Sequence, residues 1–116
     1  MKFSMHKPEV TTLAKPWIDA IGNHMWRFYY SRRNADPAQM GPASRKQWEA
    51  CHRAISRFNT AEQNVMQMYY TSEWGHDLYA VKDYSARSGM TVNNIWNIIK
   101  TANRAAAEER GLIDRG

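Results

Sequence analysis

The sequence predicts an all-α fold of about five helices that ends in a C-terminal helix-turn-helix. Apolar residues recur at i, i+3 and i+4 spacing in most of the chain, and no segment shows the alternation of a strand. Glycine and proline divide the chain into segments of helical length. The 116 residues, 43% of them hydrophobic, suit one compact domain. It is expected to join a basic, aromatic-rich helical part over residues 1–58 to a helix-turn-helix part over residues 59–116.

The first helix is expected over about residues 15–32, behind an extended arm over residues 1–15. Pro16 suits the first turn of a helix because its missing N–H costs nothing there. The apolar residues of this segment recur at helical spacing: Trp17, Ile18, Ile21, Met25, Phe28 and Tyr29. Residues 34–42 hold two prolines and a glycine, so they predict a loop.

The second helix is expected to begin at Ser44, since Ser44 and Gln47 have the spacing of a capping box. Its inward face holds Trp48, Cys51, Ile55 and Phe58. Thr60 and Gln63 repeat the capping-box spacing, so a third helix is expected from there to about Thr71. The apolar stripe of that helix is Val65, Met66, Met68 and Tyr69.

A fourth helix is expected over about residues 78–88, capped by Asp77. Its core-facing residues are expected to be Leu78, Val81 and Tyr84. Gly89 ends this helix, because glycine can adopt the positive φ that a tight turn between helices needs. Thr91 can cap a fifth helix that runs from Val92 to about Arg110, with Gly111 as its C-terminal stop.

The fifth helix has an unusual polar face. Ile95, Ile98 and Ala102 have the spacing of an inward face. The residues left for the outside are Asn93, Asn94, Asn97, Lys100, Asn103 and Arg104. Asparagine is a mediocre helix former, but its side-chain amide can pair with an adenine edge in the major groove. The helix is therefore expected to bind DNA, with asparagines at base edges and cations at phosphates. The expected DNA contacts are Arg87, Thr91, Asn93, Asn94, Asn97, Lys100, Arg104, and also Arg45 and Lys46 of the second helix.

Positive charge is concentrated outside this helix. The chain carries a formal net charge of +5 and a pI near 9.6, which is compatible with a polyanionic partner. Residues 1–60 have a net charge of +6, whereas residues 61–116 have a net charge of −1. Arg45 and Lys46 belong to the basic half and are expected to contact phosphates. The alternative is that they are ordinary solvated surface.

The basic half is also rich in aromatic residues. A dimer or partner interface is expected at Trp17, Trp26, Phe28, Tyr29 and Tyr30, because such interfaces are enriched in aromatic residues. The alternative is ordinary packing of these rings against the C-terminal helices.

Enzymatic chemistry is not expected. Cys51 is the single cysteine, which excludes an internal disulfide and fits a reducing cytoplasm. The four histidines are scattered, so neither a metal site nor a cofactor is expected. No phosphate-binding glycine loop or nucleophile motif is present. No apolar run approaches the ~20 residues of a membrane span.

Residues 58–107 resemble region four of the sigma-70 class of RNA polymerase sigma factors. That family opens with a Leu/Phe-Thr-x-x-Glu/Gln cap, and here the corresponding helix lies in the segment from Phe58 to Tyr70. The family's turn and recognition helix are matched by Gly89, Met90, Thr91, Ile95 and Ile98. Small bacteriophage regulators of late transcription, of the RinA and ArpU type, are similar in size and order of parts. The reading positions of the family are commonly Arg, Ser, Gln or Glu, whereas this chain has asparagines.

The resemblance and the asparagine face together imply a sequence-specific regulator of transcription that binds double-stranded DNA. Such a regulator would be encoded by a phage or mobile element and would act in the bacterial cytoplasm, with host RNA polymerase or a second copy of itself as partner. Two alternatives remain open. The helix-turn-helix could be the scaffold of a protein-interaction module, or the chain could be a small terminase-like subunit for DNA packaging.

Overall fold

The structure is a computed structural model that describes residues 15–73 and 76–114. Within these ranges the chain is all-α, with five α-helices and no strand, as the sequence predicts. The arm expected over residues 1–15 falls almost wholly outside the described ranges. The α-helices are α1 (Lys15–Ser31), α2 (Pro42–Ala54), α3 (Thr60–Tyr70), α4 (Asp77–Ser88) and α5 (Val92–Glu109), and the short 3-10 helices are η2 (Pro37–Gln39) and η3 (Ile55–Arg57).

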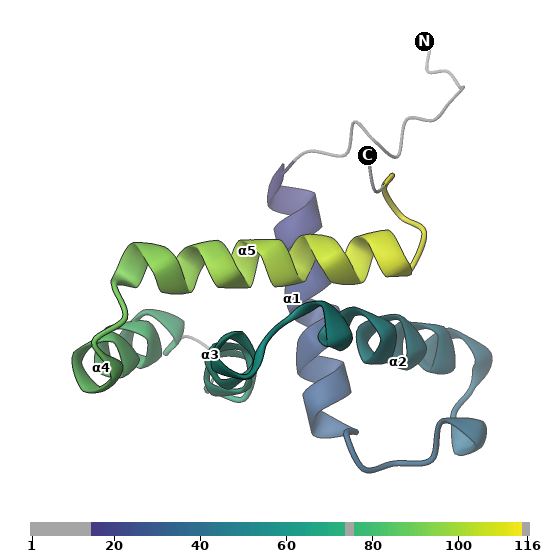
Figure 1. The fold of residues 1–116 in the computed structure, drawn as a ribbon. Coiled ribbons are helices and arrows are strands. Elements are labelled where there is room, and N and C mark those ends of the chain that lie inside the picture. The colour runs from purple at the N-terminus through teal and green to yellow at the C-terminus, as the bar shows by residue number, and fades with distance from the viewer. Residues whose placement is uncertain (1–14, 74–75, 115–116) are drawn as a thin grey trace, which may run out of the picture.

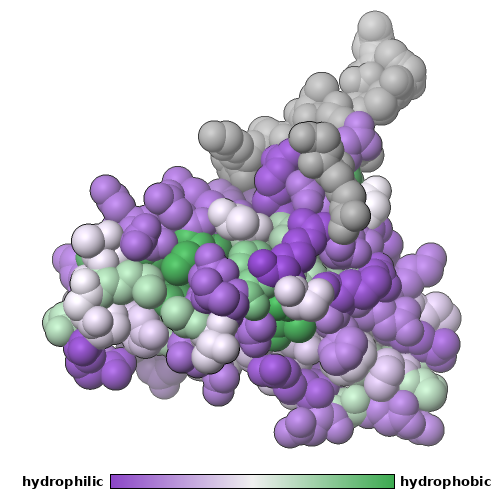
Figure 2. All heavy atoms as spheres, viewed as in Figure 1, coloured by the Kyte–Doolittle hydropathy of each residue, from purple (hydrophilic) through white to green (hydrophobic). Residues whose placement is uncertain are grey.

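Helix α5 is the centre of the fold, because it contacts each of the other four α-helices. Helix α1 crosses behind α5 at a steep angle, while α2 and α3 lie along one side of it (Figure 1). Helix α4 meets α5 through the turn at residues 89–91. Polar side chains cover most of the face shown in Figure 2, with apolar side chains mainly near its middle.

Helices α1 and α5 cross in close contact at Gly22. Gly22 is buried, and a Cβ placed on it would lie 2.6 Å from the carbonyl oxygen of Asn103. One helical turn further, the indole Nε1 of Trp26 donates a 2.7 Å hydrogen bond to the carbonyl oxygen of Ala102. The absence of a side chain at Gly22 therefore lets the two backbones approach, and Trp26 fixes their register.

Aromatic rings fill the core beside this crossing. Trp26 stacks on Tyr70 with 5.8 Å between ring centroids, and Tyr29 packs edge-on against Trp26 at 5.7 Å. Trp48 of α2 lies 5.4 Å from the Tyr29 ring, and its own Nε1 donates to the carbonyl oxygen of Arg32. These contacts join α1, α2 and α3 into one aromatic cluster.

Two helix starts differ from the sequence prediction. Helix α2 begins at Pro42, not at Ser44, because Gly41 takes the N-cap position and Pro42 the first turn. Helix α3 is capped by Asn59, not by Thr60. Asn59 Oδ1 accepts from the Glu62 amide at 2.8 Å and Glu62 Oε1 accepts from the Asn59 amide at 2.9 Å, which is a complete capping box one residue earlier.

The start of α4 also differs. His76, not Asp77, occupies the N-cap position, and it makes no side-chain capping bond. Leu78 is 53% exposed, so the prediction that it faces the core is wrong. Val81 is buried and Tyr84 is half-buried, as expected. Helix α4 thus presents a narrower apolar face than its sequence pattern predicts.

The ends of α5 match the prediction. Thr91 Oγ1 accepts from the Asn94 amide at 3.1 Å and caps the helix. Gly111 has a φ of 83° and turns the chain back, and the Leu112 amide donates to the carbonyl oxygen of Ala107 at 2.9 Å. This turn places Ile113 in a small apolar cluster with Ile18 and Ala107. No helix in the described part of the chain is long and apolar enough to cross a bilayer.

Candidate nucleic-acid interface

The turn between α4 and α5 is fixed by its own side chains. Gly89 has a φ of 80°, in the left-handed region that favours glycine. Ser85 Oγ donates to the carbonyl oxygen of Met90 at 2.7 Å, and the Met90 amide donates to Ser88 Oγ at 3.1 Å. With the Thr91 cap, these bonds set the direction in which α5 leaves the turn.

Five polar residues of α5 form an exposed row that we call the α5 strip: Asn93, Asn94, Asn97, Lys100 and Arg104. Residues 93, 97, 100 and 104 follow one line along the helix, with 94 beside it. Arg104 Nε is paired with Glu108 Oε2 at 3.1 Å. Among the described residues Lys100 has no ion pair.

Asn103 does not belong to the strip, contrary to the sequence prediction. Its side chain is buried, and Asn103 Oδ1 accepts a 2.6 Å hydrogen bond from the Tyr70 hydroxyl. The reason is the crossing at Gly22, which covers this side of α5. The polar face of α5 is therefore narrower than the sequence indicates, and Asn103 has a structural role.

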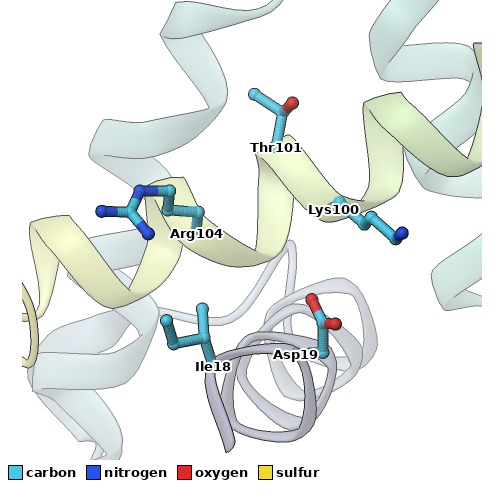
Figure 3. Close-up of a pocket in the computed structure, with 5 residues that line it drawn as sticks. All are labelled: Ile18, Asp19, Lys100, Thr101 and Arg104. Atoms are coloured by element: carbon cyan, nitrogen blue, oxygen red, sulfur yellow. The ribbon is translucent and has the colours of Figure 1, made fainter. Parts of the chain in front are cut away.

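A shallow hollow of about 230 Å³ separates the strip from the N-terminal part of α1. Its lining residues are Ile18, Asp19, Lys100, Thr101 and Arg104. Figure 3 shows Ile18 and Asp19 on α1 pointing toward α5. The half-exposed carboxylate of Asp19 thus places a negative charge beside Lys100, which the sequence reasoning missed because the two residues are 81 positions apart.

Arg87 and Thr91 lie at the other end of the strip. Arg87 is exposed, pairs with Asp83 at 2.9 Å and lies over the Tyr84 ring at 5.7 Å. The Asp83 carboxylate partly offsets its charge. Thr91 is exposed, and its oxygen accepts the cap bond while its hydroxyl proton stays available to donate.

The basic residues of α2 and η3 divide into two groups. Arg53 Nε pairs with Glu109 at 3.1 Å, and Arg57 pairs with Glu108 and Glu109 at 2.7 Å each. The hydrogen bond to Glu108 raises the pKa of the Arg57 guanidinium. These cations therefore tie α2 and η3 to the end of α5. Arg45 and Lys46 are exposed in the first turns of α2 and make no such pair with described residues.

The five aromatic residues predicted for an interface have different environments. Trp26 and Tyr29 are 0% and 1% exposed, so they belong to the core and cannot face a partner. Phe28 and Tyr30 are half-buried, and Trp17 is 64% exposed. Ordinary packing therefore accounts for the first two rings, and Trp17 is the most available of the five.

Arg27 holds the start of α4 in place, a role that the sequence did not reveal. Its guanidinium donates to the carbonyl oxygen of Ser72 at 2.7 Å and pairs with Asp77 Oδ1 at 3.0 Å. Tyr69 donates to the other oxygen of Asp77 at 3.3 Å, and burial together with the Asp77 charge raises the pKa of Tyr69 to about 12. Helix α1 thereby fixes both α3 and α4, and through them the turn that aims α5.

An exposed apolar pair on α4 was also missed. Leu78 and Tyr79 are 53% and 75% exposed and adjacent in sequence.

Among the described residues no group of His, Cys, Asp and Glu has the arrangement of a metal site. No family model, curated protein or solved structure matches this chain.

Proposed function

We propose that the chain is a sequence-specific regulator of transcription that binds double-stranded DNA through α5. The observation that supports this most is the α5 strip. It is an exposed row of asparagines with a lysine that has no ion pair among the described residues, on a helix that follows a fixed, glycine-bearing turn. In helix-turn-helix proteins the second helix enters the major groove with its N-terminal residues nearest the bases. Asn93, Asn94 and Asn97 occupy that part of α5.

The strip has the chemistry for reading and holding DNA. Each asparagine amide offers one donor and one acceptor group, which match the N6 and N7 positions of adenine. Lys100 and Arg104 follow on the same row and supply charge for phosphates. Arg104 also keeps its bond to Glu108, so Lys100 is the stronger phosphate ligand in this proposal.

A second element is needed for tight binding, because one helix contacts few base pairs. A homodimer on half-sites about 34 Å apart would double the contacts. Attachment to bacterial RNA polymerase, which the sigma-like residues suggest, would serve the same purpose. A phage or mobile-element origin belongs to the same proposal.

The test begins with selection of preferred duplexes from a random-sequence library by the full chain. Binding to the selected duplex is then measured by fluorescence anisotropy for the wild type, Asn97→Ala and Asn93→Ala. Asn64→Ala is the matched control, since Asn64 is an exposed asparagine on α3. Each strip variant is expected to lose about 1–3 kcal/mol on the selected duplex, and the control is expected to lose nothing. Selection that yields no preferred sequence, or equal binding by all four proteins, would overturn the proposal.

A protein-interaction module is the second candidate, favoured by the exposed Leu78 and Tyr79 on α4. Leu78 and Tyr79 are successive residues of a helix and point about 100° apart, but each offers an exposed apolar side chain to a partner, and Tyr is enriched at interfaces. Purified bacterial RNA polymerase is a suitable probe. In this candidate, Leu78→Asp weakens binding of the polymerase and Asn97→Ala does not. The reverse pattern, or polymerase binding unchanged by Leu78→Asp, excludes this use of α4.

A further inference from the structure

Four exposed cations, which we call the loop cluster, follow α1 directly or lie in the first turns of α2: Arg32, Arg33, Arg45 and Lys46. Lys46 also lines a hollow with Glu49 and Glu109. All four side chains are exposed, and among the described residues none is paired with a carboxylate. By contrast, other arginines each bind a carboxylate: Arg27, Arg53, Arg57, Arg87 and Arg104.

Aromatic rings, not acids, position two of these cations. The guanidinium of Arg32 lies over the Phe28 ring at 5.4 Å, and that of Arg33 lies over the Tyr30 ring at 5.4 Å. Stacking on a ring leaves the in-plane N–H groups of a guanidinium able to donate. Both side chains are thus exposed at the surface and contact aromatic rings, not carboxylates.

The loop itself is ordered by hydrogen bonds. Trp48 Nε1 donates to the carbonyl oxygen of Arg32 at 2.9 Å, which ties the end of α1 to α2. Asp36 Oδ1 accepts from the Ala38 amide at 2.9 Å and caps η2. Met40 is half-buried against the core. The cations therefore sit on a fixed surface, so little ordering entropy opposes their binding to a ligand.

The N-terminus of α2 adds to the positive character of this surface. Gly41 is the N-cap residue and provides no side-chain hydrogen bond to the first turn. The first turn of α2 contains Arg45 and no acid. A helix N-terminus carries partial positive charge from its unpaired amides. The start of α2 therefore adds to the positive potential of the loop cluster.

The loop between α1 and α2 lies on the opposite side of α5 from the N-terminal part of α1 (Figure 1). Ile18 and Asp19 line a hollow together with Lys100 and Arg104, so the N-terminal part of α1 lies on the strip side. Helix α1 then crosses α5, and the loop that follows it lies on the far side (Figure 1). The start of this loop, residues 32 and 33, therefore lies across α5 from the hollow that Lys100 and Arg104 line.

We propose that the loop cluster is a second nucleic-acid surface, which binds the phosphodiester backbone of a separate DNA segment without reading its sequence. One chain would then hold two segments of duplex, one on α5 and one on the loop between α1 and α2. Binding of the first segment, on α5, rests on the proposed function. Binding of the second segment does not, because exposed cations without carboxylate partners are sufficient for backbone binding.

The test uses the full chain and two variants of equal charge. Arg33→Gln/Arg45→Gln removes two cations from the loop cluster, and Lys82→Gln/Lys100→Gln removes two from α4 and α5. Binding to a random-sequence duplex is followed by anisotropy over a range of KCl concentrations. The loop variant is expected to lose about 0.9 of log–log salt slope for each phosphate contact removed. An unchanged affinity and slope in the loop variant would overturn the proposal.

A bridging assay tests the two segments directly. One duplex is fixed on beads, and retention of a second, fluorescent duplex is measured after addition of the protein. Both variants are expected to lose bridging. If Arg33→Gln/Arg45→Gln still bridges the two duplexes, the bridging comes from a dimer that uses two α5 strips, and the proposal is overturned.

Two further outcomes separate the proposals from each other. If Lys82→Gln/Lys100→Gln binds single duplexes as the wild type does while the loop variant binds none, the loop cluster stands and the proposed role of α5 falls. If polyglutamate is bound through the loop cluster and duplex is not, the cluster serves an acidic protein and the nucleic-acid proposal is overturned.

Discussion

Gly22 and Asn103 are in direct backbone contact where α1 crosses α5. A Cβ on Gly22 would overlap the Asn103 backbone, including its carbonyl oxygen at 2.6 Å. The contact closes off one side of α5, and the Asn103 side chain turns inward to the Tyr70 hydroxyl. This one crossing decides both how close the helices lie and which residues of α5 face solvent.

Gly22→Ala is expected to destabilise the protein. Helix propensity alone would favour alanine by about 0.5–1 kcal/mol, but the new methyl group would overlap the backbone of α5. Overpacking of a core typically costs about 1–3 kcal/mol, so the contact should outweigh the propensity. Urea unfolding followed by circular dichroism measures the sign of the change in stability. His24→Ala, at an exposed position of the same helix, should leave the midpoint nearly unchanged. A more stable Gly22→Ala variant would refute the close crossing.

Tyr30→Phe and Tyr70→Phe are expected to have opposite effects. The Tyr30 hydroxyl oxygen is buried without a hydrogen-bond partner among the described residues, so its removal should leave stability unchanged or raise it. The Tyr70 hydroxyl donates to Asn103 in the buried crossing. Its loss leaves a buried acceptor unsatisfied and should cost about 1–3 kcal/mol. Equal effects of the two substitutions in urea unfolding would contradict these environments.

Stability is expected to fall at alkaline pH. Burial raises the pKa of Tyr30 and of Tyr69 to about 12, from an ordinary value of 10.0. The folded state therefore keeps both phenols protonated at a pH where the unfolded chain ionises them. The contribution of these two phenols to the free energy of unfolding is fully present below pH 10 and is lost as pH rises toward 12. Urea midpoints measured across this window should fall, and the fall should be shallower in Tyr30→Phe. A flat profile would contradict the burial of these phenols.

Asp19→Asn is expected to strengthen DNA binding. The Asp19 carboxylate lines the same hollow as Lys100 and Arg104, where it would repel a phosphate bound by either cation. Its neutralisation should tighten binding by about 0.2–1 kcal/mol, the range for exposed charges, and the gain should shrink with added salt. Glu73→Gln removes an equal charge from the connection before α4 and serves as the control. Binding of Asp19→Asn that is no tighter than that of the wild type would show that no phosphate lies near this end of the strip.

The helices themselves follow from local sequence. Gly89, Thr91 and Gly111 act as turn, cap and stop as their chemistry predicts, because these roles depend on neighbours within a few residues. The caps of α2 and α3 lie three residues and one residue earlier than expected, at Gly41 and Asn59 in place of Ser44 and Thr60.

The site was less predictable because it depends on contacts between distant segments. The burial of Asn103 requires Gly22 of α1, and the charge beside Lys100 comes from Asp19. The exposure of Leu78 arises because α4 buries little beyond Val81. A helical period cannot distinguish a side covered by another helix from a side open to solvent. The asparagines at 93, 94 and 97 are exposed as expected, although Asn94 and Asn97 also line a hollow with Phe58 and Glu62.

The pairing of α1 with α5 has a consequence for the newly made chain. Helix α1 is synthesised before α2, α3 and α4, yet Trp26 and Gly22 find their partners at Ala102 and Asn103. These contacts can form only after α5 has left the ribosome. Until then Trp26 can pack only against rings of the earlier helices, such as Tyr70 of α3, and its indole N–H lacks the Ala102 carbonyl. A chain stalled before α5 would therefore be a substrate for chaperones. Helix α5 is therefore the helix that completes the described fold.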